Sequence, residues 1–216
     1  ALAAKIIVTG APLMLNEALW SFGQAILVQC YSVRGLGVVA AFNISSTISN
    51  VFNVAFIAMG NAVGIIVGQL LGAGKLEEAK DTDRKLIFFS TVSCAVIGAV
   101  MALFSPLFPA LYNTSDDIRR LAARFIVIAS LYMPMHAFIN AAYFTLRCGG
   151  KTLVTFFFDS VYVWLVNIPL AYVLSRYTGL HIIFLFFACQ FIDIVKCIIG
   201  FILVKKGVWM NIIVKG

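Results

Sequence analysis

The 216-residue chain is 62% hydrophobic and only 12% charged, with a mean hydropathy of +1.01. In soluble domains roughly a quarter of all residues are charged, so this composition excludes a water-soluble enzyme, a disordered chain and a nucleic-acid-binding module. The net charge of +7 comes from basic residues that flank apolar blocks. We therefore expect an all-α protein that crosses a lipid bilayer several times.

A helix that spans a bilayer needs about 20 mostly apolar residues. In chain order, the segments that satisfy this are 6–33, 36–73, 86–112, 119–146, 152–175 and 181–204. The loops between them are too short to hold a soluble domain. We expect one six-helix transmembrane bundle over residues 1–216. The chain begins without Met or a signal peptide, which favours a fragment of a longer polypeptide.

The second segment is ambiguous, because residues 35–74 carry no formal charge over twice the usual span length. Asn43, Ser46, Asn50 and Asn53 recur every three or four residues, which places them on one helical face. We expect that face to be buried in protein. The pattern favours one long helix over two short spans, and the charged stretch KLEEAKDTDRK after it predicts a surface helix.

Basic residues distinguish the two sides of the bundle. One side carries Lys5, Lys75, Lys80, Arg84, Lys85, Arg147, Lys151, Lys205, Lys206 and Lys215; the other carries Arg34, Arg119, Arg120, Arg124 and Arg176. Cytoplasmic loops hold the excess of Lys and Arg, so both ends of the chain are expected in the cytoplasm.

Gly60, Gly64, Gly68 and Gly72 recur every four residues along the long helix. They therefore share one face, and small residues at this spacing allow another helix to approach closely. The stripe predicts helix packing.

Charged residues inside spans are costly and mark functional sites by default. Glu17, Ser21 and Gln24 lie on one side of the first helix, a polar stripe suited to a cavity wall. Trp20 is a further candidate for that wall. The alternative for Glu17 is a structural carboxylate that neighbouring helices satisfy by hydrogen bonds.

On the fourth helix, His136, Asn140, Tyr143 and Arg147 share a face. A neutral imidazole at position 136 is suited to proton transfer, and a buried, satisfied histidine is the other interpretation. Both remain open.

Asp159 on the fifth segment has no cation nearby in the sequence, and it must find one across helices, face water or be protonated. Tyr162 lies one turn further, so acid and aromatic ring together could hold a cation. Asp193 and Lys196 are i, i+3 neighbours and predict a structural ion pair.

Nothing in the sequence indicates catalysis, a cofactor or a metal centre. GxSxG, HExxH and P-loop motifs are absent, and the five cysteines show no metal-ligand spacing. The chain is not expected to be an enzyme.

The segment VGQLLGAGKLEEAK, preceded by APLMLNEALWSFG and followed by LRCGGKT, resembles the second half of multidrug and toxic compound extrusion (MATE) transporters. The resemblance implies helices seven to twelve of a twelve-helix, two-lobe fold, with the N-terminal lobe of the same polypeptide as partner. It implies export of organic cations and drugs in exchange for Na⁺ or H⁺ by alternating access. The location would be the plasma (inner) membrane, and the short loops favour a bacterial source.

The same resemblance implies that an acidic residue in the first helix binds the coupling ion, and Glu17 matches that position, so Na⁺ could bind there. Many cation-coupled members carry an Asp in the fourth helix, where this chain has His136. That departure puts a site with two carboxylates in doubt.

Two other functions stay open. Lipid-linked oligosaccharide flippases share the wider multidrug/oligosaccharidyl-lipid/polysaccharide superfamily fold, but they would need a cationic cavity for phosphates, for which only Lys196 and Arg147 are candidates. The other is an inactive or self-pairing half-transporter, or a membrane scaffold.

Overall fold

The computed structural model describes the backbone of residues 2–210 and the side chains of residue 11 and residues 13–210. Lys5 and Lys215, which contribute to the predicted orientation, lie outside the described side chains. All regular structure in the described part is helical. In chain order, its elements are α1 (Leu2–Ser32), α2 (Leu36–Gly72), α3 (Leu76–Leu103), α4 (Leu107–Ala110), α5 (Asp116–Cys148), α6 (Thr152–Phe156), the π-helical η1 (Phe157–Val161) and η2 (Val163–Asn167), α7 (Ile168–Tyr177), α8 (Ile182–Phe191) and α9 (Asp193–Lys205).

Five helical segments are long and apolar enough to cross a membrane: 36–72, 76–103, 116–148, 152–177 and 182–205. The predicted span at 6–33 corresponds to α1, whose first side chains lie outside the described residues, so that span stays a prediction. These segments establish an all-α, multi-pass membrane protein.

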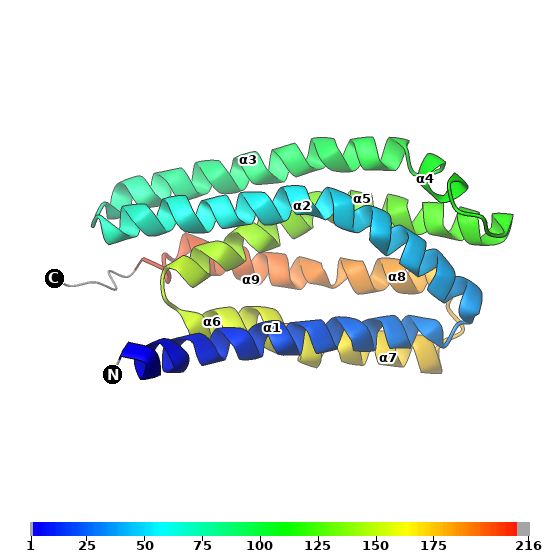
Figure 1. Ribbon diagram of the computed structural model, residues 1–216, viewed down its shortest axis with the longest axis horizontal. Coiled ribbons are helices and arrows are strands. Elements are labelled where there is room, and N and C mark those ends of the chain that lie inside the picture. Colours follow the sequence, from blue (N-terminus) through cyan, green and yellow to red (C-terminus); the bar gives the residue numbers. More distant parts are fainter. Residues whose placement is uncertain (1, 211–216) are drawn as a thin grey trace.

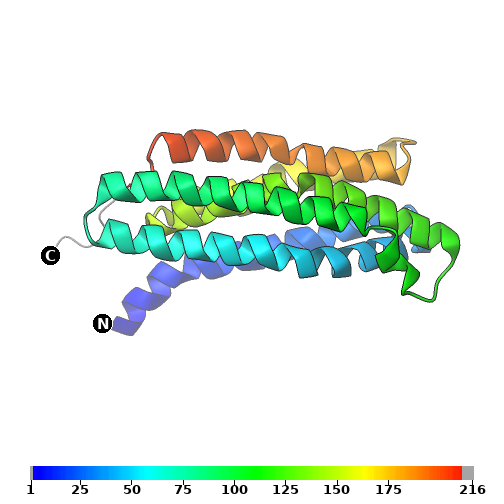
Figure 2. The same cartoon turned by 90° about the horizontal axis from the view of Figure 1, so that it is seen from above.

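The helices run along one long axis (Figure 1). α5 is the central helix and packs most extensively against α2 and α3, with α8 and α9 on another side. α1 lies against α6, η1 and α7, which Figure 1 shows on the opposite side of the bundle from α3. The view turned by 90° shows the same elongated arrangement (Figure 2).

The expected span 86–112 differs from the observed helix at both ends. α3 begins at Leu76, so the stretch KLEEAKDTDRK forms its first turns rather than a separate surface helix. The helix ends at Leu103, shortly before Pro106 and Pro109. Proline lacks a backbone N–H and disrupts the preceding turn, which explains the early end.

The second segment is one long helix, as predicted, but the expected burial of its polar face is wrong for the described chain. Asn43 and Asn50 are exposed, and Ser46 and Asn53 are half-buried. The neighbouring stripe of Val38, Ala41, Ser45 and Ser49 is buried instead.

The glycine stripe of α2 faces α5 over most of its length. A Cβ at Gly60 would overlap the Asn140 side chain, and a Cβ at Gly64 would lie 3.3 Å from Phe144. A Cβ at Gly68 would lie at an ordinary 3.6 Å from Cys148. Gly72 departs from the prediction, since a Cβ there would meet nothing within 4 Å.

Candidate functional site

A connected group of polar side chains joins α1, α5, η1 and α9, and Asn16 is at its centre. Asn16 is only 1% exposed. Its Nδ2 donates to the Tyr143 hydroxyl at 3.2 Å and to Asp159 Oδ2 at 3.3 Å. The Ser160 hydroxyl lies 2.7 Å from Asn16 Oδ1 and donates to it. We call the whole group the Asn16 network; its members are Asn16, Glu17, Tyr143, Arg147, Asp159, Ser160 and Lys196.

One end of the network is a buried ion pair. Lys196 Nζ lies 2.6 Å from Asp159 Oδ1, and the lysine is 7% exposed. The ammonium also lies 5.3 Å from the ring centre of Phe158 and 6.0 Å from that of Tyr162. Asp159 therefore finds its cation across helices, one of the outcomes that the sequence allowed.

The predicted Asp193–Lys196 ion pair is wrong. Asp193 is the first residue of α9, directly after the break at Ile192, and its carboxylate contacts Asn167 and His136 instead. Lys196 lies nearly a full turn further along α9, with its ammonium on η1. The i, i+3 spacing allows the two side chains to approach each other, but each contacts residues on neighbouring helical segments instead.

The other end of the network reaches the surface of the described chain. The Tyr143 hydroxyl donates to Glu17 Oε1 at 3.3 Å, and Arg147 Nη1 lies 3.5 Å from the same oxygen. Arg147 also donates to the Tyr143 hydroxyl at 3.4 Å. The Glu17 side chain is 58% exposed. Glu17 thus combines access from outside with hydrogen bonds that lead inward.

The fifth span has an unusual local geometry where the network passes through it. Asp159 and Ser160 lie on η1, and η2 follows directly. Pro169 stands at the start of α7 and lacks an N–H, and its ring would clash with the carbonyl of Leu165 in an α-helix. The wider π turn of η2 relieves that clash. Such turns occur frequently at functional sites.

A second polar group lies around the break between α8 and α9. Asn167 Nδ2 donates to Asp193 Oδ1 at 3.0 Å, and His136 Nε2 lies 3.7 Å from Asp193 Oδ2. The carbonyl of Ile192, at the break itself, accepts a 2.7 Å hydrogen bond from the Tyr162 hydroxyl. Side chains from α5, from η2 and from Tyr162, which lies between η1 and η2, thus meet at an interrupted helix.

The residues singled out from the sequence lie in different places in the structure: some in the Asn16 network, some in the second polar group and some outside both. It links Glu17 to Asp159 through Asn16 and Tyr143, and it places His136 with Asp193 in the second group. Trp20 is 41% exposed and Gln24 half-buried on α1. Asn140 lies against Gly60 of α2, and its Oδ1 has no hydrogen-bond partner among the described residues.

Sequence reasoning missed the uncharged members Asn16, Ser160 and Asn167, because one polar residue in an apolar segment gives no distinct signal. It also missed Asp83, which is fully buried and accepts a 2.6 Å hydrogen bond from the Thr145 hydroxyl. Asp83 is one of several charged residues in KLEEAKDTDRK, so its charge alone did not distinguish it. A signal existed, since Asp83 lies four residues after buried Ala79 and four before buried Ile87.

The anionic groups of the network are its two carboxylates, Glu17 and Asp159. The Asp159 carboxylate is ion-paired with the Lys196 ammonium, whereas the Glu17 carboxylate is ion-paired with the half-exposed Arg147. Among the described residues, no three His, Cys, Asp or Glu side chains gather as a metal site. Glu17 is the more exposed of the two carboxylates, with 58% of its side chain accessible against 16% for Asp159.

Charged, hydrogen-bonded side chains lie between helices that are long and apolar enough to span a membrane, and such residues mark ion or substrate pathways by default. Residues 12–173 match the family model MatE, and the chain belongs to this family, that of the MATE transporters rather than of enzymes. The chain is 26% identical to the "Probable multidrug resistance protein YoeA" of Bacillus subtilis, over 81% of this chain and 38% of that protein. It is 24% identical to the "Probable multidrug resistance protein NorM" of Oceanobacillus iheyensis, over 66% and 32%. For the "Multidrug resistance protein MdtK" of Edwardsiella ictaluri, the identity is 25%, over 79% and 37%. The chain therefore spans only about a third of the length of these relatives.

Proposed function

We propose that residues 1–216 form one six-helix lobe of a secondary transporter that exports small organic cations and drugs in exchange for Na⁺ or H⁺. The N-terminal lobe of the same polypeptide would complete the cavity between the lobes. The family membership and the names of the relatives support export of drugs. The exposed Asn43 and Asn50 support a further element or a watery cavity against α2.

The observation that carries the proposal is the continuity of the Asn16 network from exposed Glu17 to the buried Lys196–Asp159 pair. A carboxylate that binds Na⁺ or H⁺ attracts its former partners less strongly. Occupation of Glu17 would therefore loosen its hold on Arg147 and Tyr143 of α5. Because the contacts of Glu17 on α1 with Tyr143 and Arg147 on α5 would then weaken, ion binding would favour one arrangement of these helices over another.

The proposed roles follow from these positions. Glu17 is the principal ion-coupling residue. Asp159 and His136 are secondary, since their side chains are less exposed than that of Glu17. Trp20, Gln24 and Asn140 are proposed to line the substrate path. Tyr162, a further candidate from the sequence, is buried and its hydroxyl donates to the Ile192 carbonyl.

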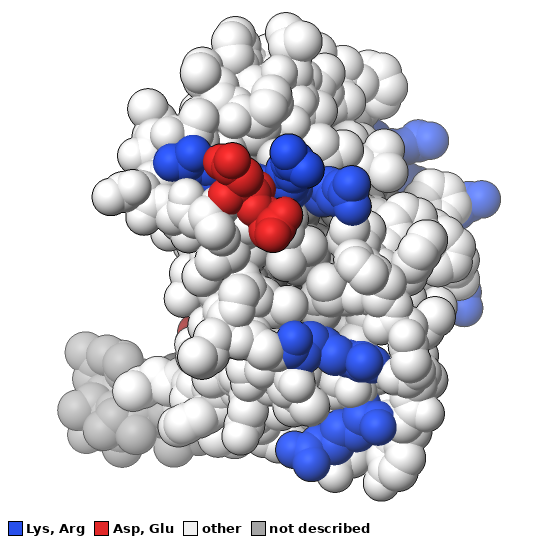
Figure 3. All heavy atoms as spheres, turned by 90° about the vertical axis from the view of Figure 1, so that its right-hand side faces the viewer, with Lys and Arg blue, Asp and Glu red and all other residues white. Residues whose placement is uncertain are grey.

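The proposed location is the plasma (inner) membrane of a bacterium, with both ends of this segment in the cytoplasm. Figure 3 views the opposite end of the bundle, where the α1–α2, α4–α5 and α7–α8 connections lie. Basic side chains there form separate groups, one of them beside acidic side chains. The end with Lys75, Lys151 and Lys205 carries the larger number of basic residues in the sequence, which supports its cytoplasmic placement.

The test is ethidium accumulation in cells that express the intact parent gene, with wild type and Glu17→Gln at equal membrane levels. Export by wild type that Glu17→Gln abolishes supports Glu17 as the coupling residue. Glu77→Gln is the matched control, because Glu77 lies in the exposed first turn of α3. Equal export by all three proteins would refute the role of Glu17. Absence of export by wild type would refute the multidrug assignment.

The site offers less support to a flippase of lipid-linked oligosaccharides. Its two candidate phosphate ligands, Lys196 and Arg147, are paired with Asp159 and Glu17. A self-pairing half-transporter or scaffold would instead migrate as a dimer in detergent and leave ethidium accumulation unchanged.

A further inference from the structure

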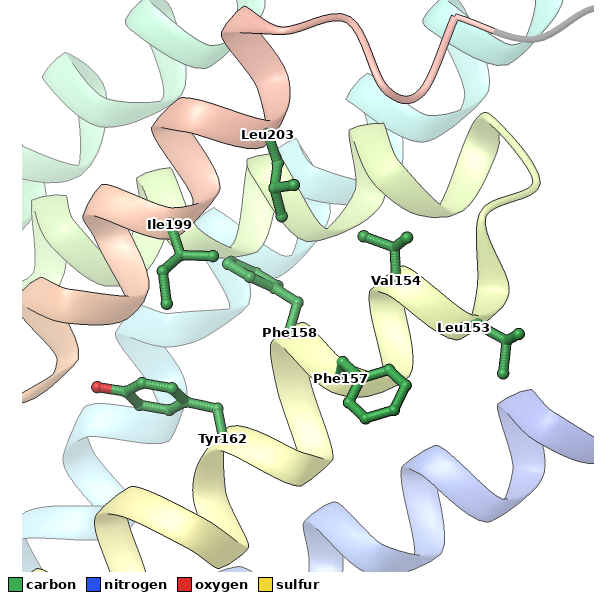
Figure 4. Close-up of a pocket in the computed structure, with 7 residues that line it drawn as sticks. All are labelled: Leu153, Val154, Phe157, Phe158, Tyr162, Ile199 and Leu203. Atoms are coloured by element: carbon green, nitrogen blue, oxygen red, sulfur yellow. The ribbon is translucent and has the colours of Figure 1, made fainter.

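A hollow of about 460 Å³ lies between α6, η1 and α9, away from Glu17. Its lining is almost entirely carbon and consists of Leu153, Val154, Phe157, Phe158, Tyr162, Ile199 and Leu203. Figure 4 shows Ile199 and Leu203 on α9 facing Val154 and Phe158, with Leu153 at the far edge and the Tyr162 hydroxyl directed away from the other side chains. That hydroxyl donates to the Ile192 carbonyl, so it offers no polar contact to an occupant.

The hollow opens to the surface between two membrane spans. Leu153 and Phe157 on one wall are 67% and 61% exposed, whereas Phe158 and Tyr162 are buried at its base. Its volume lies within the ~300–1,000 Å³ of ligand pockets. An apolar, open hollow at membrane depth favours a hydrocarbon chain over a polar or charged ligand.

Lysines lie at one end of this hollow. Lys151 precedes the lining residue Leu153 by two positions, and Lys205 follows the lining residue Leu203 by two. Two residues advance a helix by only ~3 Å, so each lysine starts close to the hollow. The two walls also meet here, because Gly149 lies against the main chain of Trp209.

These lysines are not neutralised by acidic neighbours in the described part of the chain. Lys151, Lys205 and Lys206 have no carboxylate within 4.0 Å there, whereas Lys75 and Lys85 at the same end pair with Glu78 and Asp81. Lys205 and Lys206 are exposed. The end of the hollow therefore presents uncompensated positive charge where the spans 152–177 and 182–205 begin and end.

We propose that the hollow and its lysines form a binding site for an anionic glycerophospholipid. One acyl chain would occupy the hollow, and the phosphate of the headgroup would lie between Lys151 on one side and Lys205 and Lys206 on the other. Basic residues beside transmembrane helices attract anionic headgroups, and each buried methylene adds to acyl-chain binding. A cationic drug does not fit this description, because the lysines would repel it. This proposal does not depend on the transport function.

Native mass spectrometry of the intact parent protein tests the site. The detergent-purified protein is titrated with phosphatidylglycerol and, separately, with phosphatidylcholine of the same acyl chains. We expect one phosphatidylglycerol to be retained at concentrations where phosphatidylcholine is not. Lys205→Gln/Lys206→Gln should weaken that binding about thirtyfold, because each lysine near an anionic headgroup strengthens lipid binding about fivefold.

Lys75→Gln/Lys85→Gln is the matched control, since it removes the same charge from the same end but from paired lysines. Ile199→Trp should fill the hollow and lower phosphatidylglycerol binding, whereas Ile202→Trp on the same helix, outside the lining, should not. Equal binding of the two lipids overturns the proposal. So does equal weakening by the two lysine pairs, which would indicate a general effect of net charge. If Ile199→Trp does not fold, the exposed lysine pairs still decide the outcome.

Discussion

The ammonium of Lys196 on α9 lies 2.6 Å from the carboxylate of Asp159 on η1, and both side chains are largely buried. Each charge compensates the other at membrane depth. Lys196→Met should therefore leave a buried, unpaired carboxylate and cost about 3–5 kcal/mol of stability. The measurement is thermal unfolding of the intact parent protein in detergent.

The double variant Lys196→Met/Asp159→Asn provides the control for this pair. It removes both charges together and should recover most of the stability lost in Lys196→Met, because apolar replacement of a buried pair is often neutral. A single variant as stable as wild type would contradict the dependence of the Asp159 carboxylate on the Lys196 charge.

Tyr143 should contribute through its hydroxyl rather than its ring. The hydroxyl accepts from Asn16 and Arg147 and donates to Glu17, so Tyr143→Phe leaves the buried Asn16 amide with one partner fewer. We expect a loss of about 1–3 kcal/mol, measured by thermal unfolding. Tyr177→Phe is the matched control, because Tyr177 is 75% exposed. Equal stability of the two variants would contradict a structural role for the hydroxyl.

The two ends of the glycine stripe should respond differently to the same change. Gly60→Ala places a methyl group where Asn140 and Phe144 already lie, so we expect a lower unfolding temperature and a lower yield of folded protein. Gly72→Ala meets open space and should be neutral or slightly stabilising, since Ala is favoured over Gly in helices by ~1 kcal/mol. A similar loss in both variants would contradict the observed α2–α5 contact.

Thr145 is the hydrogen-bond donor to buried Asp83 and joins α5 to α3. Thr145→Val should cost about 1–3 kcal/mol, because the carboxylate would then be left without that donor. Thr91→Val serves as comparison, since the Thr91 hydroxyl bonds only to the Ile87 carbonyl of its own helix. Denaturation that affects Thr91→Val as strongly as Thr145→Val would show that the loss does not come from the Asp83 contact.

Much of the fold follows from hydropathy and helix period. The long apolar stretches predicted five segments that the structure contains, and the even spacing of asparagine and serine correctly favoured one long helix at 36–72. The helix ends were less predictable. The start of α3 at Leu76 depends on a charged stretch that continues an apolar helix without interruption.

The partners within the site could not be predicted. Periodicity states which residues share a face of one helix, but not which helix lies opposite. For that reason the sequence identified Asp159 and Lys196 as charged residues and assigned Lys196 to Asp193. Asn43 and Asn50 show the same limit, because their polar pattern predicted a buried face that the described chain leaves exposed.

The π turns of the fifth span have a consequence for how this segment tolerates changes in length. Each turn holds about one residue more than the 3.6 of an α-helix. Deleting one residue between Asp159 and Asn167 would keep the segment apolar and long enough to span. One π turn would then revert to the α form, which needs about one residue fewer, and the residues on either side would keep their direction around the helix axis. Asp159 would therefore still meet Lys196 while Asn167 meets Asp193. An insertion has no such surplus to remove, so this span should allow loss of one residue within the π turns more readily than gain of one.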